Sequence, residues 1–162
     1  MNGIRYALSR VHSGENEMHK LLLRAAEVHH TEHEVHHVAR DLAAWSAKHI
    51  QHLAEHAEQL GIDLDGEADS PNMLAERVRA TTSKLVGRRP EGGVLLLHDL
   101  RNLYLQGSDN SLHWEMLAQI AQAKHQRDLL ALTEECHPQT LRQIRWANTV
   151  LKTQSPQILA SI

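Results

Sequence analysis

Apolar residues recur every three or four positions through most of the chain, a spacing that predicts α-helices rather than strands. In the segment 2–30 the apolar stripe comprises Ile4, Leu8, Val11, Met18, Leu22 and Ala25. In the segment 32–60 it comprises Val35, Val38, Leu42, Ser46, His49, Leu53 and Leu60. We therefore expect two long helices over about 2–30 and 32–60, joined by a short turn.

The second half of the chain shows the same arrangement. Helical spacing covers about 94–124 and 126–152, with almost nothing between the two segments. A polar, turn-rich segment separates the two halves, and Ser70 and Pro71 within it predict a short helix over about 71–86. Four long helices with two short turns and one long crossover predict an all-α, ferritin-like four-helix bundle, formed as a single domain over 1–162.

Several residues predict where these helices begin, end or bend. The sequence "TEHE" predicts a capping box in which Thr31 caps the second helix and Glu34 reaches back to it. Gly61 predicts the end of that helix. We expect a disturbance at "GSDN" (107–110) and a kink at Pro138, because proline removes a helical hydrogen bond and frees a carbonyl.

Charge and cysteine content limit the classes of protein to which the chain can belong. The formal net charge is -3 at pH 7, which argues against a nucleic-acid binder because such proteins present a basic field. No apolar run approaches the roughly 20 residues of a membrane span, so we expect no membrane partner. Cys136 is the single cysteine, which excludes an internal disulfide and is typical of a reducing compartment. We expect a cytoplasmic protein.

Three short stretches resemble a known family. The stretches are "VHSGENEMHKLLLRAA" (11–26), "HIQHLAEHAEQLG" (49–61) and "LHDLRNLYLQG" (97–107). They resemble the first three helices of ferritin-like proteins, specifically the small bacterial stress-associated members of unknown activity. The resemblance covers most of the chain as topology and these stretches as sequence. It implies a comparison with the di-metal members, whose ligands point inward from all four helices as glutamates and two Glu-x-x-His pairs.

This resemblance implies a set of candidate metal ligands. Glu15 matches the family's first glutamate, and His49 matches the histidine of its second helix. In "EECH" the spacing of Glu134 and His137 looks like the family's Glu-x-x-His pair. Carboxylate and imidazole groups suit iron, manganese or zinc. The candidate metal site therefore comprises Glu15, His49 and His137.

The rest of the family's ligand set is missing. Ser46, and not a glutamate, lies three residues before His49. The stripe of the third helix has no carboxylate and comprises Leu96, Leu100, Leu103, Gly107, Trp114, Ala118 and Ala121. His98 and Asp99 fall off the centre of this stripe, and Glu134 points away from the stripe of the fourth helix. We therefore expect neither a complete di-iron centre nor the ferroxidase activity of such a centre.

The many histidines have simpler interpretations than a catalytic site. The stretch "EVHHTEHEVHH" (27–37) places five histidines at the corner between the first two helices, and we expect three of them on the surface: His33, His36 and His37. His33 and His37 lie one turn apart and can bind an adventitious metal or contact a neighbouring subunit. His49, His52 and His56 share one side of the second helix, a spacing that can chelate a metal, but we favour a structural role for them.

The tryptophans and the cysteine are also interpreted as structural. Large apolar residues at helical spacing indicate a core or an interface, and Trp45 and Trp114 lie toward one edge of their stripes, which favours a subunit interface. Trp146 is assigned to the core or an interface on the same argument. Cys136 is interpreted as a small buried residue.

Two functions therefore stay open. The first is a metal-binding protein on a ferritin-like scaffold. The second is a metal-free interaction or stress-related protein that keeps the fold and assembles as a homo-oligomer, with a dimer favoured. In that case Glu15 and His49 hydrogen-bond across adjacent helices, because a buried polar group needs a partner. A haemerythrin-type oxygen-binding or oxidative enzyme is disfavoured, because most histidines cluster on the first helical hairpin.

Overall fold

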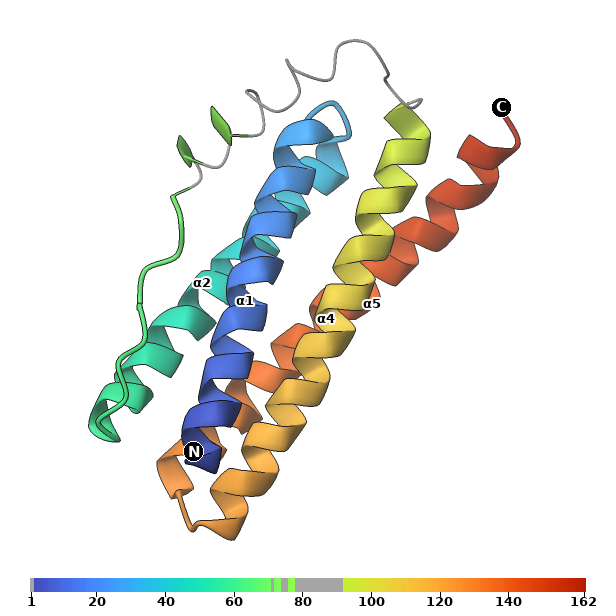
Figure 1. Ribbon diagram of the computed structural model, residues 1–162. Helices are drawn as coiled ribbons and strands as arrows, with labels where there is room; N and C mark the ends of the chain where they lie inside the picture. Colours follow the sequence, from blue (N-terminus) through green and yellow to red (C-terminus); the bar gives the residue numbers. More distant parts are fainter. Residues whose placement is uncertain (1, 71, 74–75, 78–91) are drawn as a thin grey trace.

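Four long helices make up most of the structure (Figure 1). In this computed structural model, residues 2–70, 72–73, 76–77 and 92–162 are described. The helices are α1 (Gly3–Val28), α2 (His33–Gln59), α4 (Gly92–Ala123) and α5 (Arg127–Leu159). Within the described ranges there is no strand, and the expected all-α four-helix bundle is confirmed.

The helices form two antiparallel hairpins, α1 with α2 and α4 with α5, and α1 packs against α4 as well (Figure 1). The end of α2 lies beside the turn between α4 and α5, whereas α4 begins at the opposite end of the bundle. Consequently α2 and α4 run in the same direction, and their connection has to span the length of the bundle. A single connection of this kind is the topology expected from the sequence.

The hydrophobic core consists of two clusters stacked along the bundle axis. One contains Leu22 and Leu100, and the other contains Leu8 and Leu117. All six residues of the stripe expected in the first helix are buried. Between the two clusters lies a layer of buried polar side chains, which we call the polar layer: Glu15, Ser46, His49, Asn110, Thr140 and Gln143. The polar layer is the place in the described structure where chemistry could occur inside the bundle.

The predicted end of the second helix is confirmed, but its predicted start is wrong. Gly61 has a φ of 70°, and the N–H of Ile62 donates to the carbonyl of Ala57, which closes the C-terminus. At the other end the chain turns, the cap is Glu32, and no side chain caps the helix. Thr31 therefore lies outside α2, and the capping box of Thr31 and Glu34 does not form.

The long helices are more continuous than expected. Residues 107–110 are helical throughout, so the expected disturbance there is wrong. The space above Gly107 is filled by the Ile144 side chain, so the glycine permits close packing of α5 instead of breaking α4. Helix α5 runs through Pro138 and Pro156 to Leu159, beyond the expected end at residue 152. Beyond Pro156, the Ile158 side chain packs against the core and so stabilises the last turn of the helix.

Only part of the crossover is described. Ser70 caps the next segment as expected, since its Oγ accepts a hydrogen bond from the N–H of Met73 at 3.3 Å. Residues 72–73 and 76–77 are helical, and the remainder of the helix expected over about 71–86 lies outside the described residues. None of the described helices is both long enough and apolar enough to cross a membrane.

Candidate functional site

The polar layer receives side chains from all four helices. Glu15 on α1 is 0% exposed and His49 on α2 is 1% exposed. Each residue lies on the apolar stripe of its helix, so helix packing carries it into the bundle centre. The sequence therefore correctly placed both residues inside. Buried charges in such a position require partners, because burial removes the solvation that stabilises them.

The Glu15 carboxylate has one fully used oxygen. Its Oε1 accepts a hydrogen bond from Nε1 of Trp114 at 2.8 Å and a longer one from Oγ1 of Thr140 at 3.3 Å. These donors come from α4 and α5, so one carboxylate links three helices. The Trp114 ring is 0% exposed, and it packs edge-on against the His49 ring with centroids 5.8 Å apart. Trp114 is therefore a core residue, and the expectation that it faces a subunit interface is wrong.

His49 lies between two hydrogen-bond acceptors. Its Nε2 donates to Oε1 of Gln139 at 2.7 Å, and its Nδ1 lies 3.2 Å from Oε2 of Glu15. Burial lowers the pKa of His49, but the Glu15 carboxylate and Cys136 raise it, and the pKa reaches about 10. With acceptors on both ring nitrogens, the doubly protonated imidazolium is the form that satisfies the site. Glu15 and His49 form a buried ion pair.

The ion pair is close but poorly aligned. Although Nδ1 of His49 and Oε2 of Glu15 are within ion-pair distance, neither atom has a hydrogen-bond partner with good geometry. Both atoms are fully buried, and together with Oε1 of Gln143 they are the polar-layer atoms that have unused bonding capacity. The sequence-based alternative, in which the two residues meet across adjacent helices, agrees with this contact.

The third candidate ligand is engaged elsewhere. Nε2 of His137 is hydrogen-bonded to Oγ of Ser111 at 2.8 Å, and His137 is half-buried. Glu134, which precedes it in the Glu-x-x-His spacing, is exposed. The structure thus brings Glu15 and His49 together, whereas the hydrogen bond of His137 runs to the neighbouring α4. The exposed Glu134 and the half-buried His137 do not join Glu15 and His49 at the bundle centre.

The donor atoms at the centre do not form the ligand set of a transition-metal site. Oε1 of Glu15 and Nε2 of His49 are already used in hydrogen bonds, which leaves two unpartnered donors, Oε2 and Nδ1. Protein sites for zinc, iron or manganese typically use at least three protein ligands. Across the described parts of the chain, no group of three or more His, Cys, Asp or Glu side chains converges as a metal site would require.

Two other residues of the polar layer, Gln143 and Ser46, connect helices by hydrogen bonds. Nε2 of Gln143 donates to the carbonyl of Leu42 at 2.9 Å and to Oγ of Ser46 at 3.0 Å, which ties α5 to α2. Ser46, at which the resemblance implies a glutamate, serves as a hydrogen-bond acceptor for Gln143.

A second buried pair lies nearer the end of the bundle where α4 begins. Nε2 of His29 lies 2.8 Å from Oδ2 of Asp99, and both side chains are under 10% exposed. NH2 of Arg24 lies 3.8 Å from the other carboxylate oxygen. Asp99 is buried, although its spacing from the other stripe residues predicts a position off the centre of the stripe. Its position three residues after Leu96 and four before Leu103 was the signal that it faces inward.

The histidines at the helix corner do not converge on one point. The rings of His33 and His37 are stacked with centroids 6.4 Å apart, and both residues are exposed. Nδ1 of His36 is hydrogen-bonded to the carbonyl of Ala26 at 2.8 Å, so this ring ties α2 to α1. The corner interpretation describes these residues well.

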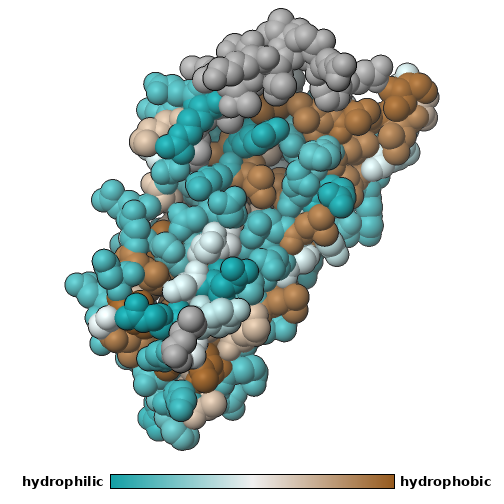
Figure 2. All heavy atoms as spheres, in the orientation of Figure 1, coloured by the Kyte–Doolittle hydropathy of each residue, from teal (hydrophilic) through white to brown (hydrophobic). Residues whose placement is uncertain are grey.

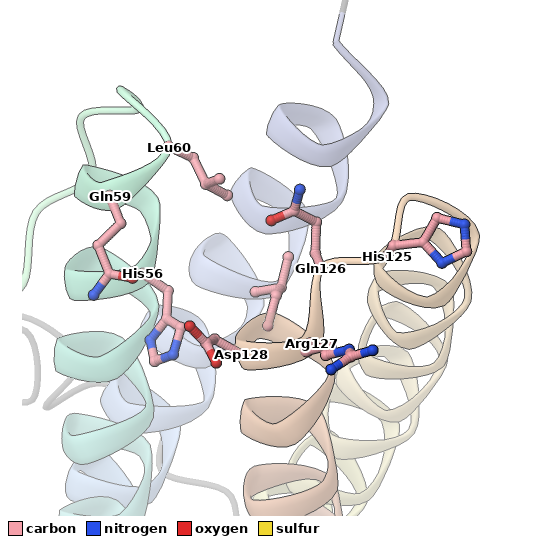
Figure 3. A pocket seen from close by; sticks show the side chains of 8 residues that line it. His56, Gln59, Leu60, His125, Gln126, Arg127 and Asp128 are labelled. Carbon is pink, nitrogen blue, oxygen red and sulfur yellow. The ribbon is translucent and has the colours of Figure 1, made fainter.

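A pocket of about 350 Å³ lies at the end of the bundle where α2 meets the α4–α5 turn (Figure 3). Its lining comprises His56, Gln59, Leu60, His125, Gln126, Arg127, Asp128 and Leu129. Figure 3 shows the side chains of His56 and Asp128 close together, with His125 and Arg127 on the far side. The pocket is open to solvent and includes none of the three candidate metal ligands. It presents mixed charges without a set of groups directed at one ligand.

Comparisons with known proteins give no match. Neither a family model, nor a curated protein, nor a solved structure is significantly similar to this chain. The functional argument therefore rests on the geometry of the chain itself.

Proposed function

We propose that this chain is a metal-free, homo-oligomeric interaction protein that keeps a ferritin-like bundle as its scaffold. The exposed apolar surface of α4 carries this proposal. The polar layer supports it, because Glu15 and His49 satisfy each other's charge and leave too few donors for a tightly held metal. In this proposal Glu15 and His49 form an ion pair that stabilises the bundle, and the function depends on the outer surface of the bundle.

The outer face of α4 is unusually apolar. Leu105, Leu112 and Met116 are 49%, 59% and 46% exposed, and they project from the side of α4 opposite its buried residues. Hydrophobic side chains are visible on the α4–α5 side of the molecule, over the beginning of α4 and in separate patches farther down (Figure 2). Apolar residues aligned on one exposed helix face are typical of an interaction site.

The test is the mass of the untagged protein in solution, measured by light scattering over a range of concentrations. We expect an oligomer that dissociates in the Leu112→Glu variant, because a charge at the centre of an apolar contact opposes its burial. The matched control is Tyr6→Glu, which places the same charge at an exposed aromatic residue of α1 and should leave the mass unchanged. A monomeric wild type at all concentrations would refute the proposal.

A weakly bound cation is the second candidate function, favoured by the unpartnered Oε2 of Glu15 and Nδ1 of His49. Iron, manganese or zinc could bridge two such atoms only with ligands added from solvent. Elemental analysis of untagged protein, purified without added metal, separates the candidates. Stoichiometric metal in the wild type that is lost in His49→Ala would support the cation. Equal, substoichiometric content in both proteins would support the metal-free bundle, and the comparison cancels metal bound by surface histidines.

A further inference from the structure

Three of the exposed apolar residues of α4 form a narrow stripe. Leu105, Leu112 and Met116 are spaced by seven and four residues, so they lie within about 20° of one line along the helix. Together they extend over about 16 Å. The opposite side of α4 is buried and also carries large apolar residues, among them Leu103 and Trp114. A helix with two apolar faces is expected to be covered on both, and within the described structure only one is covered.

A fourth exposed apolar residue, Leu141, extends this stripe onto α5. Leu141 is 43% exposed and lies between His137 and Ile144 in sequence. His137 contacts Ser111, and Ile144 fills the space above Gly107, which places Leu141 level with the midpoint of the α4 stripe. The outer apolar surface is therefore centred between Leu105 and Leu112. We call its four residues the outer stripe: Leu105, Leu112, Met116 and Leu141.

Two opposite charges flank the outer stripe at nearly equal distances from its midpoint. Arg101 lies four residues before Leu105, and Glu115 lies three residues after Leu112. Both are exposed, and helical geometry places both on the edge of the stripe that faces α5. Neither has an ion-pair partner among the residues that the structure describes.

We propose that a second copy of this chain covers the outer stripe, with the two α4 helices antiparallel about a twofold axis near Ser108 and Asp109. This inference deepens the proposed function and rests on it. A twofold axis perpendicular to antiparallel helices brings the same edge of each helix together. Leu105 then meets Leu112 of the second copy, the two Leu141 side chains approach each other, and Arg101 lies opposite the other copy's Glu115.

The antiparallel arrangement is favoured by charge. A parallel pairing would leave Arg101 and Glu115 at different levels and on opposite edges, so that neither charge finds a partner. The antiparallel pairing forms two Arg–Glu contacts, one on each side of the axis, and places them at the rim of an apolar centre. The acidic Asp109 near the axis lies on the edge that faces α1, where its carboxylate is 3.4 Å from Nε2 of His113.

Charge reversal tests this geometry separately from association itself. In Arg101→Glu or Glu115→Arg, two attractive contacts become repulsive, and we expect the dimer to dissociate roughly tenfold more readily. The double variant Arg101→Glu with Glu115→Arg restores opposite charges, and its dissociation constant should return to within about threefold of the wild-type value. All four proteins are compared by sedimentation equilibrium at low salt, with circular dichroism as a check on folding.

The possible failures are distinguishable. If Leu112→Glu separates the subunits but the single charge reversals change nothing, or the double variant is no better than the singles, the antiparallel geometry is wrong while association through α4 stands. If the wild type is monomeric, the proposed function fails and this inference fails with it. If the single variants dissociate and the double variant associates again, Arg101 pairs with Glu115 across the axis, and the antiparallel geometry is supported.

Discussion

Nδ1 of His49 lies 3.2 Å from Oε2 of Glu15 at the centre of the bundle, where both side chains are almost completely buried. This contact joins α1 to α2, and Trp114 and Thr140 attach the same carboxylate to α4 and α5. One residue therefore connects with all four helices. The pair therefore links the four helices through a buried carboxylate and a protonated imidazole.

Removing one member of the ion pair should destabilise the protein more than removing both. His49→Gln leaves the Glu15 carboxylate buried without a counter-charge, and we expect the free energy of unfolding to fall by about 3–5 kcal/mol. Adding Glu15→Gln removes the stranded charge and should recover part of this loss. Urea unfolding of the wild type, both single variants and the double variant gives the coupling energy. Strictly additive losses would show that the two residues do not interact.

The stability of the protein should fall in alkaline solution. The pKa of His49 is raised in the folded state to about 10, whereas an unfolded histidine titrates near 6.5. The stabilisation is therefore complete below about pH 6.5 and is lost as the pH rises toward 10, with a decrease on the order of 3 kcal/mol above neutrality.

Denaturant unfolding at intervals between about pH 6 and pH 10 measures this decrease. Other groups also titrate at alkaline pH, so the control is the double variant Glu15→Gln with His49→Gln. Its free energy of unfolding should decrease less between about pH 6 and pH 10, because the ion pair no longer contributes. Parallel curves for the wild type and the double variant would contradict a charged His49 in the folded protein.

Alanine at position 14 should destabilise the bundle, although alanine favours helices. Gly14 lies against Asn110, whose Nδ2 donates to the Gly14 carbonyl at 3.0 Å, and an added Cβ would collide with the Asn110 amide. We expect Gly14→Ala to cost about 1–3 kcal/mol. Gly92→Ala is the control, because nothing lies within 4 Å of a Cβ at that position. Equal thermal midpoints for both variants would mean that α1 and α4 separate easily at this point.

The sequence predicted the buried pair better than it predicted the pair's surroundings. Glu15 and His49 stand out because each interrupts an apolar stripe, which is a property of one helix. Trp114, which donates to Glu15, is separated from it by 99 residues, and its orientation depends on how α4 packs on α1. No local pattern distinguishes a tryptophan that faces a neighbouring helix from one that faces a subunit.

Local interactions also explain which end of α2 was predicted correctly. Gly61 ends the helix because its left-handed backbone conformation is a property of the residue itself. The expected capping box does not form because the turn between α1 and α2 makes Glu32, and not Thr31, the N-cap of a helix that begins at His33. That start is fixed by how the two helices meet, including the hydrogen bond from His36 to the Ala26 carbonyl.

The sequence alone determined four amphipathic helices, their order, the long crossover and the burial of Glu15 and His49, because helical periodicity fixes which side of each helix must avoid water. Tertiary structure decided the rest. It turned His137 toward Ser111, engaged two of the four donor atoms of Glu15 and His49, and carried α5 through Pro156. These outcomes depend on distances between helices, and residues far apart in sequence set those distances through packing.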